Sequence, residues 1–324
     1  MKLASGAVEN PRPRSFKIGI LLVHGIGTEH AEWAEEIIPR IQEAILSEAR
    51  KLLPENPPRN ADEIAVMESV YWADTLNEKQ RVLEERLNQA QEPLRLTLRL
   101  WLSFRWLWRL LAWWLRRKEY EFVSRSVADV IGYLQTDAEK LVHQRMEQAL
   151  DRLVGDVGVV GRKAPLTIVS HSLGTVISSD FVYDQTKKRR AAGKAGFHEK
   201  AQLENFFTVG SPLALFSIKY GGPDAFKNPI SVESSQGRWI NIRDADDPIG
   251  MPLKVLNEAY DRVVQRDVRV NAGLYLISHM RYFRDRDTLK IIGGKVALDW
   301  IALNGRLPKE RVSGLRARYD EDPR

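Results

Sequence analysis

The segment PLTIVSHSLG, residues 165–174, decides which fold we expect for this chain of 324 residues. Its first six residues are mostly apolar or β-branched, which is typical of a strand buried on both faces of a sheet. The residues after Ser172 have a helical pattern through about residue 185. The segment therefore predicts a strand, a tight turn and a helix in direct succession.

Predicted strands and helices alternate on both sides of this segment. Further strands are expected over residues 17–23, 64–72, 203–209 and 238–243, with β-rich runs at 263–270 and 274–277. Helices are expected over 31–52, 76–93, 127–154 and 286–303, and a basic loop over 186–200. Because such alternation builds βαβ units, we expect an α/β protein with a mostly parallel sheet flanked by helices.

One domain is expected to hold this sheet. Residues 1–15 are polar and are expected to form a flexible leader, followed by the α/β domain over residues 16–303. A helical insertion is expected over residues 75–126, and a loose polar tail over residues 304–324.

The composition limits the classes of function that need to be considered. Hydrophobic residues make up 44% and charged residues 28%, as in an ordinary globular protein, and the formal net charge is +6. The chain has no cysteine, which excludes disulfides, thiolate zinc sites, iron–sulfur clusters and a cysteine nucleophile. Because the first residues show no apolar signal segment, a cytoplasmic protein is expected.

Ser172 is the predicted nucleophile. Residues 170–174 (SHSLG) follow the pattern G-x-S-x-G with serine in place of the first glycine, and they lie between a predicted strand and a predicted helix. The sharp turn needs small flanking residues, and Ser170 and Gly174 are small. The N–H group of Leu173 is expected to stabilise an oxyanion at the N-terminus of the helix. The alternative is a chance occurrence of this pattern after a strand.

The residues His24, Gly25, Ile26 and Gly27 directly follow the first predicted strand. In proteins with such a turn, a loop after an early strand supplies the second oxyanion donor, and the N–H group of Ile26 is the expected donor here. Gly25 and Gly27 would let the backbone approach a substrate closely. His24 precedes the nucleophile and is expected to be structural. A tight turn without a catalytic role is the alternative.

A general base is expected among the two histidines that follow Ser172. His198 lies in the basic loop and is expected to be solvated. His279 follows the apolar run LYLIS, and a histidine just beyond a strand end is well placed to accept the serine proton. A half-buried histidine with a structural role is the alternative for His279.

The matching acid is expected after the strand at 238–243, where Asp244, Asp246 and Asp247 compete. Asp247 is preferred because Pro248 fixes the backbone after it and starts a rigid loop. It would orient the imidazole and stabilise the imidazolium. Asp244 and Asp246 are expected to cap the loop, since close carboxylates raise one another's pKa and only one should contact the base.

Several segments together resemble the serine lipases and esterases of the α/β-hydrolase fold, and more narrowly the DDHD-domain intracellular phospholipases. The segments are VHGIG, SHSLGTVISSD, FFTVGSPLALF, NIRDADDPIGMPL and SHMRY. The resemblance implies hydrolysis of an acyl ester, with Ser172 as nucleophile, Asp247 as acid and His279 as base. It also implies that residues 210–212 (GSP) shape the site.

This resemblance covers residues 17–30 and 127–282. We expect a shorter protein than those, without their flanking domains, and residues 75–126 have no counterpart in them. The resemblance therefore implies ester hydrolysis and leaves open whether the substrate is a phospholipid. We expect the reaction to need no metal ion and no organic cofactor.

Residues 93–118 differ from the rest of the chain because they hold six arginines, one lysine and no acidic residue. Wound as a helix, residues 94–118 place the arginines within an arc of about 120°, opposite a face of leucines. That pattern is typical of an amphipathic helix lying in a membrane interface, where it could act as a lid. Five tryptophans suit such an interface: Trp101, Trp106, Trp108, Trp113 and Trp114.

The expected partners are an acyl-ester or lipid substrate and an anionic membrane surface, which the basic residues 187–194 (KKRRAAGK) would attract. This loop lacks interleaved aromatic residues, so nucleic acid is not expected. Three alternatives remain open. The chain could be a catalytically silent hydrolase that acts as a membrane-binding scaffold. It could be an esterase for soluble substrates, with residues 94–118 packed in the core. The same residues could instead contact a second copy of the chain.

Overall fold

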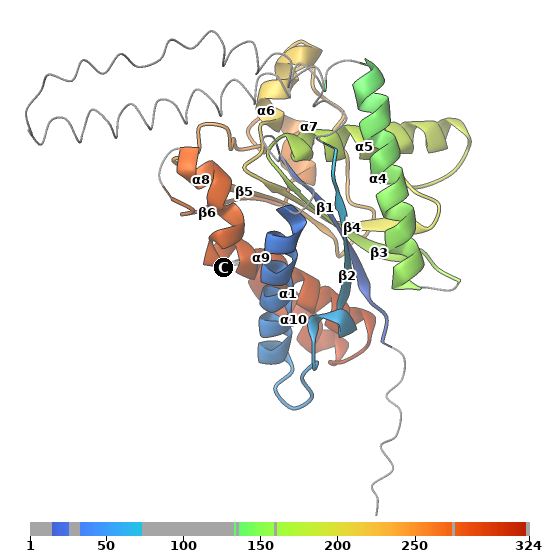
Figure 1. Cartoon of the computed structure of the whole chain (residues 1–324), viewed down its shortest axis with the longest axis vertical. Coiled ribbons are helices and arrows are strands. Elements are labelled where there is room, and N and C mark those ends of the chain that lie inside the picture. Colours follow the sequence, from blue (N-terminus) through green and yellow to red (C-terminus); the bar gives the residue numbers. More distant parts are fainter. Residues whose placement is uncertain are drawn as a thin grey trace, which may run out of the picture.

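A computed structural model describes residues 15–25, 33–72, 133, 136–158, 161–273 and 276–321. These residues form an α/β structure with a six-stranded sheet flanked by helices (Figure 1). All neighbouring strands are parallel, and their order is β2-β1-β3-β4-β5-β6. The expected parallel sheet with flanking helices is confirmed.

Each strand lies close to a predicted position. The strands are β1 (Ile18–Val23), β2 (Ala65–Val70), β3 (Ala164–His171), β4 (Ala201–Val209), β5 (Arg238–Asp244) and β6 (Arg266–Val270). The helices are α1 (Trp33–Leu52), α4 (Thr136–Val157), α5 (Leu173–Ala191), α6 (Leu213–Phe216), α7 (Glu258–Val263), α8 (Leu276–Arg281), α9 (Arg286–Leu303) and α10 (Lys309–Glu321).

Two apolar clusters cover the two faces of the sheet, because alternate side chains of each strand point to opposite faces. In β1, Leu21 and Val23 pack in the cluster under α4 and α5, whereas Ile18, Ile20 and Leu22 pack in the cluster under α1 and α9. All six residues of β1 are buried, as the apolar run predicts. Figure 1 shows α4 and α5 on one side of the sheet and α1, α9 and α10 on the other.

The C-terminal residues correct one expectation. Instead of a loose tail, α10 packs on α9, where Val312 is buried and the Tyr319 hydroxyl donates a hydrogen bond to the carbonyl of Ile291. The predicted basic loop is also shorter than expected, because α5 continues to Ala191. The prediction of β structure at 274–277 was wrong in part, because Leu276 begins the short helix α8.

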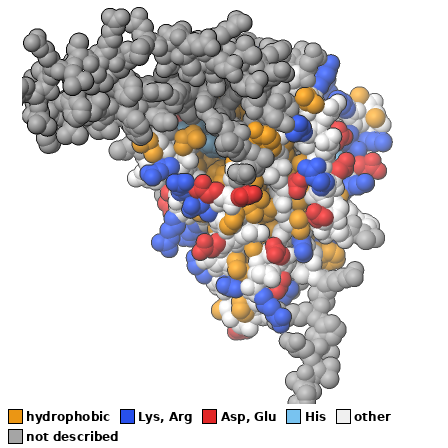
Figure 2. All heavy atoms as spheres, in the orientation of Figure 1, with side chains coloured by type: hydrophobic (Ala, Val, Ile, Leu, Met, Phe, Trp, Pro, Cys, Tyr) orange, Lys and Arg blue, Asp and Glu red, His pale blue; other side chains and the backbone are white. Residues whose placement is uncertain are grey.

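The residues expected to form the leader, and all of those expected to form the insertion, lie outside the described residues, apart from Ser15. The proposed interfacial helix at 94–118 is therefore not described. In the part of the chain that the structure does describe, no helix has the length and apolar character needed to cross a membrane. On the face shown in Figure 2, Lys and Arg side chains are interspersed with Asp and Glu side chains.

The strand order creates a topological switch point at the carboxyl end of β1. The chain leaves β1 for β2 on one side, while β3 pairs with β1 on the other side. In open α/β sheets, ligands bind outside the carboxyl ends of the strands at such a point. Here, the residues after β1 and β3 are His24 and Ser172.

Candidate active site

Ser172 lies in the turn between β3 and α5 with a strained backbone. Its φ is 53° and its ψ is −130°, and no other non-glycine residue in the described ranges has a positive φ. Its N–H group donates a hydrogen bond to the carbonyl of Val209 at 2.9 Å, which ties the turn to the end of β4. An unfavourable conformation held by its surroundings is characteristic of functional turns.

Two glycines allow the loop after β1 to contact this turn. A Cβ atom on Gly25 would lie 2.5 Å from Cβ of Ser172, and one on Gly174 would lie 2.3 Å from the carbonyl oxygen of His24. Neither distance is compatible with a side chain. The expected need for a small residue at Gly174 is confirmed, whereas Gly25 lies against Ser172 itself, and its predicted approach to a substrate stays a prediction.

Ser172, His279 and Asp247 lie in one line of hydrogen bonds. Nε2 of His279 is 2.8 Å from Oγ of Ser172, and Nδ1 of His279 is 2.8 Å from Oδ2 of Asp247. Because a carboxylate only accepts, Nδ1 carries the proton and donates to Asp247. In the neutral imidazole, Nε2 then accepts the hydrogen bond of the serine hydroxyl. The structure thus brings together the three side chains that the sequence singles out.

Asp247 accepts two further hydrogen bonds, which fix its orientation. The N–H group of Ile249 donates to Oδ1 at 2.9 Å, and the hydroxyl of Tyr282 donates to Oδ2 at 2.8 Å. Burial raises the pKa of Asp247, but the hydrogen bond and charge of His279, with those two donors, outweigh burial and lower it below its ordinary value. The carboxylate is therefore ionised near neutral pH.

The other two aspartates have different roles. Asp244 accepts hydrogen bonds from the N–H groups of Asp246 and Ala272, at 2.9 and 2.6 Å, and so joins two loops. Asp246 is exposed. Of the three aspartates, Asp247 alone is hydrogen-bonded to His279 in the structure.

The sequence patterns assign no role to His171 and Tyr282, although both residues lie in segments that carry the resemblance. Nε2 of His171 donates to the carbonyl oxygen of His279 at 2.8 Å, which fixes the backbone that carries the predicted base. Burial lowers the pKa of His171 to about 3, so this imidazole is neutral. The Tyr282 hydroxyl accepts from the N–H group of Asp244 at 2.7 Å while it donates to Asp247.

Close backbone approach also encloses the His279–Asp247 pair. Gly210 has a φ of 56°, and a Cβ atom there would lie 3.2 Å from Nδ1 of His279 and 2.7 Å from the ring of Tyr282. A Cβ atom on Gly250 would lie 2.6 Å from Oδ2 of Asp247. Only glycine fits these two positions without displacing the pair. Gly210 belongs to the segment that the resemblance implies shapes the site.

Ser211, from the same segment, stabilises the turn at Ser172 through hydrogen bonds. Its hydroxyl lies 2.7 Å from Oγ1 of Thr175, and Thr175 donates to the carbonyl oxygen of Ser172 at 2.7 Å. Because the Thr175 proton is used in that bond, Ser211 is the donor to Thr175. The two hydroxyls therefore hold the backbone of Ser172.

The side chain of His24 forms none of the hydrogen bonds that join Ser172, His279 and Asp247. Its Nδ1 donates to the carbonyl of Gly25 at 2.5 Å, its Nε2 accepts from the N–H group of Trp72 at 3.3 Å, and its ring stacks on Trp72. Burial lowers the pKa of His24 to about 3. The ring is neutral and fastens the loop after β1 to the end of β2.

Of the other residues with an expected role, Leu173 and His198 lie within the described residues and the rest do not. Leu173 is the first residue of α5, where backbone N–H groups have no partner within the helix, as an oxyanion donor requires. His198 is mostly buried instead of solvated, and its Nδ1 accepts from the N–H groups of Lys200 and Ala201. The following residues lie outside those described: Ile26, Gly27, Trp101, Trp106, Trp108, Trp113 and Trp114.

Comparison with known proteins assigns no family to this arrangement. No protein-family model matches the chain, and a search of curated proteins finds no significant match.

Proposed function

We propose that the chain is a serine ester hydrolase of the α/β-hydrolase fold, with Ser172 as its nucleophile. The observation that carries the proposal is the hydrogen-bonded line from Ser172 through His279 to Asp247, ending at a serine with strained backbone. The order of these residues along the chain, serine then aspartate then histidine, is the order found in α/β-hydrolases.

The geometry supports a two-step acyl transfer. His279 accepts the proton of the Ser172 hydroxyl at Nε2 while Oγ attacks the acyl carbonyl carbon. The oxyanion that forms is stabilised by N–H donors, of which Leu173 at the start of α5 is one. His279 then donates its proton to the leaving alcohol, and an acyl ester remains on Oγ.

Water completes the reaction by the same route. His279 removes a proton from the water molecule, the resulting hydroxide attacks the acyl ester, and the proton returns to Oγ of Ser172 as the carboxylic acid departs. Asp247 keeps the proton on Nδ1 and stabilises the imidazolium formed in each step. No step uses a metal ion or an organic cofactor.

We further propose that the substrate is a lipid ester taken from an anionic membrane surface by a peripherally bound cytoplasmic protein. Support comes from the sequence of residues 94–118, whose arginine arc and five tryptophans suit a lipid headgroup layer. Basic residues also end α5, where Lys188, Arg189 and Arg190 lie in the last turn. Cationic residues near an anionic surface strengthen such binding.

An ester series tests the chemistry and the surface together. Rates are measured for acyl chains from short to long, with and without anionic vesicles, for the wild type and for Ser172→Ala. The proposal predicts hydrolysis that depends on Ser172 and increases with vesicles for long chains. Absence of hydrolysis for every ester would support a catalytically silent scaffold instead.

Vesicle co-sedimentation separates a membrane-bound enzyme from an esterase for soluble substrates. The wild type is expected to sediment with anionic vesicles, and Trp108→Glu is expected to sediment less, because a charged side chain would replace an interfacial ring. Negligible binding by both proteins, with hydrolysis intact, would remove the membrane part of the proposal and leave the chemistry.

A further inference from the structure

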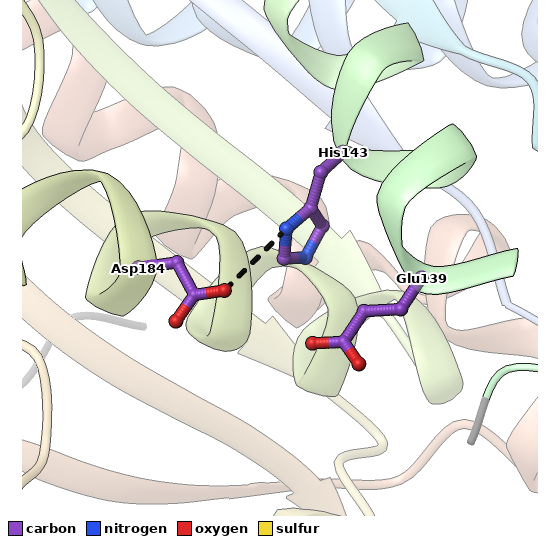
Figure 3. A group of neighbouring side chains, drawn as sticks. All are labelled: Glu139, His143 and Asp184. Carbon is purple, nitrogen blue, oxygen red and sulfur yellow. Dashed lines mark ion pairs between the residues drawn. The ribbon is translucent and has the colours of Figure 1, made fainter. Parts of the chain in front are cut away.

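A histidine and two carboxylates converge between α4 and α5, and we call them the interhelical cluster: Glu139, His143 and Asp184. Glu139 and His143 lie one turn apart on α4, and Asp184 faces them from α5 (Figure 3). One nitrogen or oxygen atom of each side chain lies within 4.8 Å of the others. Nδ1 of His143 is 3.8 Å from Oδ2 of Asp184, which is too long for a hydrogen bond.

The imidazole of His143 is the unusual member of the interhelical cluster. The residue is 9% exposed, and its buried Nε2 has no hydrogen-bond partner among the described residues. Buried polar atoms are almost always paired, so this nitrogen needs an explanation. Figure 3 shows one ring nitrogen directed at Asp184 and the other on the side of Glu139. An imidazole can give a single ion only one of its nitrogens, and the unpartnered Nε2, on the side of Glu139, is the donor available to a ligand.

The surrounding charges favour a cation. Asp180 lies one turn before Asp184 on α5, and burial, together with the charges of Glu139 and Asp184, raises its pKa to about 6. Burial lowers the pKa of His143 to about 4, so its imidazole is neutral near pH 7 and can act as a ligand. Lys188, a cation that acts on His143 from α5, lowers the pKa of His143 less than the charge of Asp184 raises it.

We propose that the interhelical cluster binds one divalent transition-metal ion of the zinc type and that this ion fastens α4 to α5. Imidazole nitrogen and carboxylate oxygen are ligands that Zn²⁺ accepts, at about 2.0–2.2 Å in tetrahedral geometry with water as a fourth ligand. That geometry needs donor atoms about 3.4 Å apart. Glu139 and Asp184 are partly exposed, so their side chains can move the short distance required.

The proposed ion is separate from the hydrolytic site. Asp184 lies about 18 Å along α5 from Ser172, because a helix rises 1.5 Å per residue. The ion would stabilise the helix pair without touching substrate. The sequence carries a signal for it, since E-x-x-x-H at 139–143 places a carboxylate and an imidazole on one helix face.

Metal binding to the full chain tests the proposal. Protein stripped with a chelator is titrated with Zn²⁺ and with Co²⁺ against a chromogenic competitor, and thermal unfolding is followed in parallel. We expect one tightly bound ion per chain, visible absorption from bound Co²⁺ and a higher Tm. Asp184→Asn and Glu139→Gln, which keep the side-chain shapes, should each weaken binding at least about tenfold.

Asp151→Asn is the matched control. It removes a carboxylate on α4 that lies 3.9 Å from Nε2 of His198, a pair of similar geometry outside the interhelical cluster. This variant should bind the metal like the wild type. Equal affinities for the wild type, Asp184→Asn and Glu139→Gln would overturn the proposal, as would binding no tighter than millimolar. Binding of Ca²⁺ or Mg²⁺ but not Zn²⁺ or Co²⁺ would overturn the assigned class of ion.

Discussion

Two clusters of polar side chains pack against the sheet, and they differ in the group at which their hydrogen bonds end. The carboxyl-edge cluster consists of Ser172, Asp247, His279 and Tyr282, and the α9 cluster consists of Asn205, Lys295, Asp299 and Arg316. In the α9 cluster, Lys295, Arg316 and Asn205 all donate to the Asp299 carboxylate, at 2.6, 3.1 and 2.8 Å. Lys295 and Asp299 lie one turn apart on an ordinary helix.

The carboxyl-edge cluster is built differently, since its hydrogen bonds lead to a hydroxyl in a strained turn. In the α9 cluster, two cations and an amide donate to the carboxylate of Asp299, and this arrangement pairs charges without placing a base beside a hydroxyl. An imidazole without a proton on Nε2, facing a serine hydroxyl, is a base next to a nucleophile. Backbone conformation and the terminal hydroxyl distinguish the carboxyl-edge cluster from the α9 cluster, and both features support the proposed nucleophile.

The largest expected effect is on hydrolysis by Ser172→Ala. Removal of the nucleophile should lower kcat by about 10⁴-fold or more, because oxyanion stabilisation and binding alone leave little catalysis. Initial rates on an active ester measure it. Ser172→Gly should be equally inactive but more stable than Ser172→Ala by about 1 kcal/mol, since glycine relieves the positive φ. Equal stability of the two variants in urea would contradict the assigned strain.

The second effect separates the three aspartates. Asp247→Asn should lower kcat by about 10⁴-fold, because the amide no longer holds the His279 proton on Nδ1. Asp246→Asn is the matched control and should retain wild-type kcat, as its side chain is exposed. Steady-state kinetics on both variants give the answer. A wild-type rate for Asp247→Asn would remove Asp247 from the mechanism.

The third effect concerns the α9 cluster and should appear in stability, not in catalysis. Lys295→Met leaves the buried carboxylate of Asp299 without one of its two cations and should destabilise the fold by about 3–5 kcal/mol. Arg262→Met, which breaks an exposed pair with Glu258 at the same spacing, is the control and should change stability by under about 0.5 kcal/mol. Chemical denaturation compares them, while kcat should stay near wild type in both.

A smaller effect is expected from Gly25→Ala. The added Cβ would lie 2.5 Å from Cβ of Ser172, so the loop or the nucleophile must move, and kcat should fall by about 10²-fold. Gly155→Ala is the control, because α4 has open space at that position and alanine favours the helix. Its kcat should be unchanged. Wild-type kinetics for Gly25→Ala would show that this loop is not fixed against the turn.

The last prediction is a pH dependence of stability that arises from the buried histidines. Burial lowers the pKa of His24 and His171 to about 3, whereas the unfolded chain protonates histidine near 6.5. Because the unfolded state binds these protons first, stability should fall as the pH drops below about 6.5, by up to about 1.4 kcal/mol per pH unit for each histidine. NMR titration should find both rings neutral at pH 5, with the proton on Nδ1 of His24 and on Nε2 of His171. Protonation of either ring near pH 6.5 would contradict the burial.

Local sequence patterns predicted the sheet and the three main side chains. The run before His24 is apolar throughout and the run before Ser172 is mostly apolar or β-branched, so the buried strands and their carboxyl ends follow from local residues. The choice of Asp247 also followed from its neighbour Pro248. Each of these signals involves only residues that are close in sequence, so it can be recognised without knowing how the chain packs.

The region around His279 shows why other parts of the site could not be predicted from the sequence. Local pattern favours a strand at 274–277, yet in α8 the apolar Ile277 and Met280 are 50% and 57% exposed while Ser278 and His279 are fully buried. In α8 the polar side chains are buried and the apolar ones are exposed, which is the reverse of the usual arrangement. Hydrophobic periodicity therefore predicts a strand where the structure has a helix. The roles of His171 and Tyr282 depend on how α8 packs over the ends of β3 and β5, which no local pattern encodes.

Labelling with a fluorophosphonate tests the central claim most directly, because the probe reacts with a serine only when a neighbouring base activates it. The wild type is expected to gain one phosphonyl group, located by mass spectrometry on the peptide that contains Ser172, with loss of fluoride. Ser172→Ala should gain none, and Asp247→Asn should react far more slowly. A folded wild type that stays unlabelled, or a Ser172→Ala variant that labels as fast as the wild type, would contradict the account.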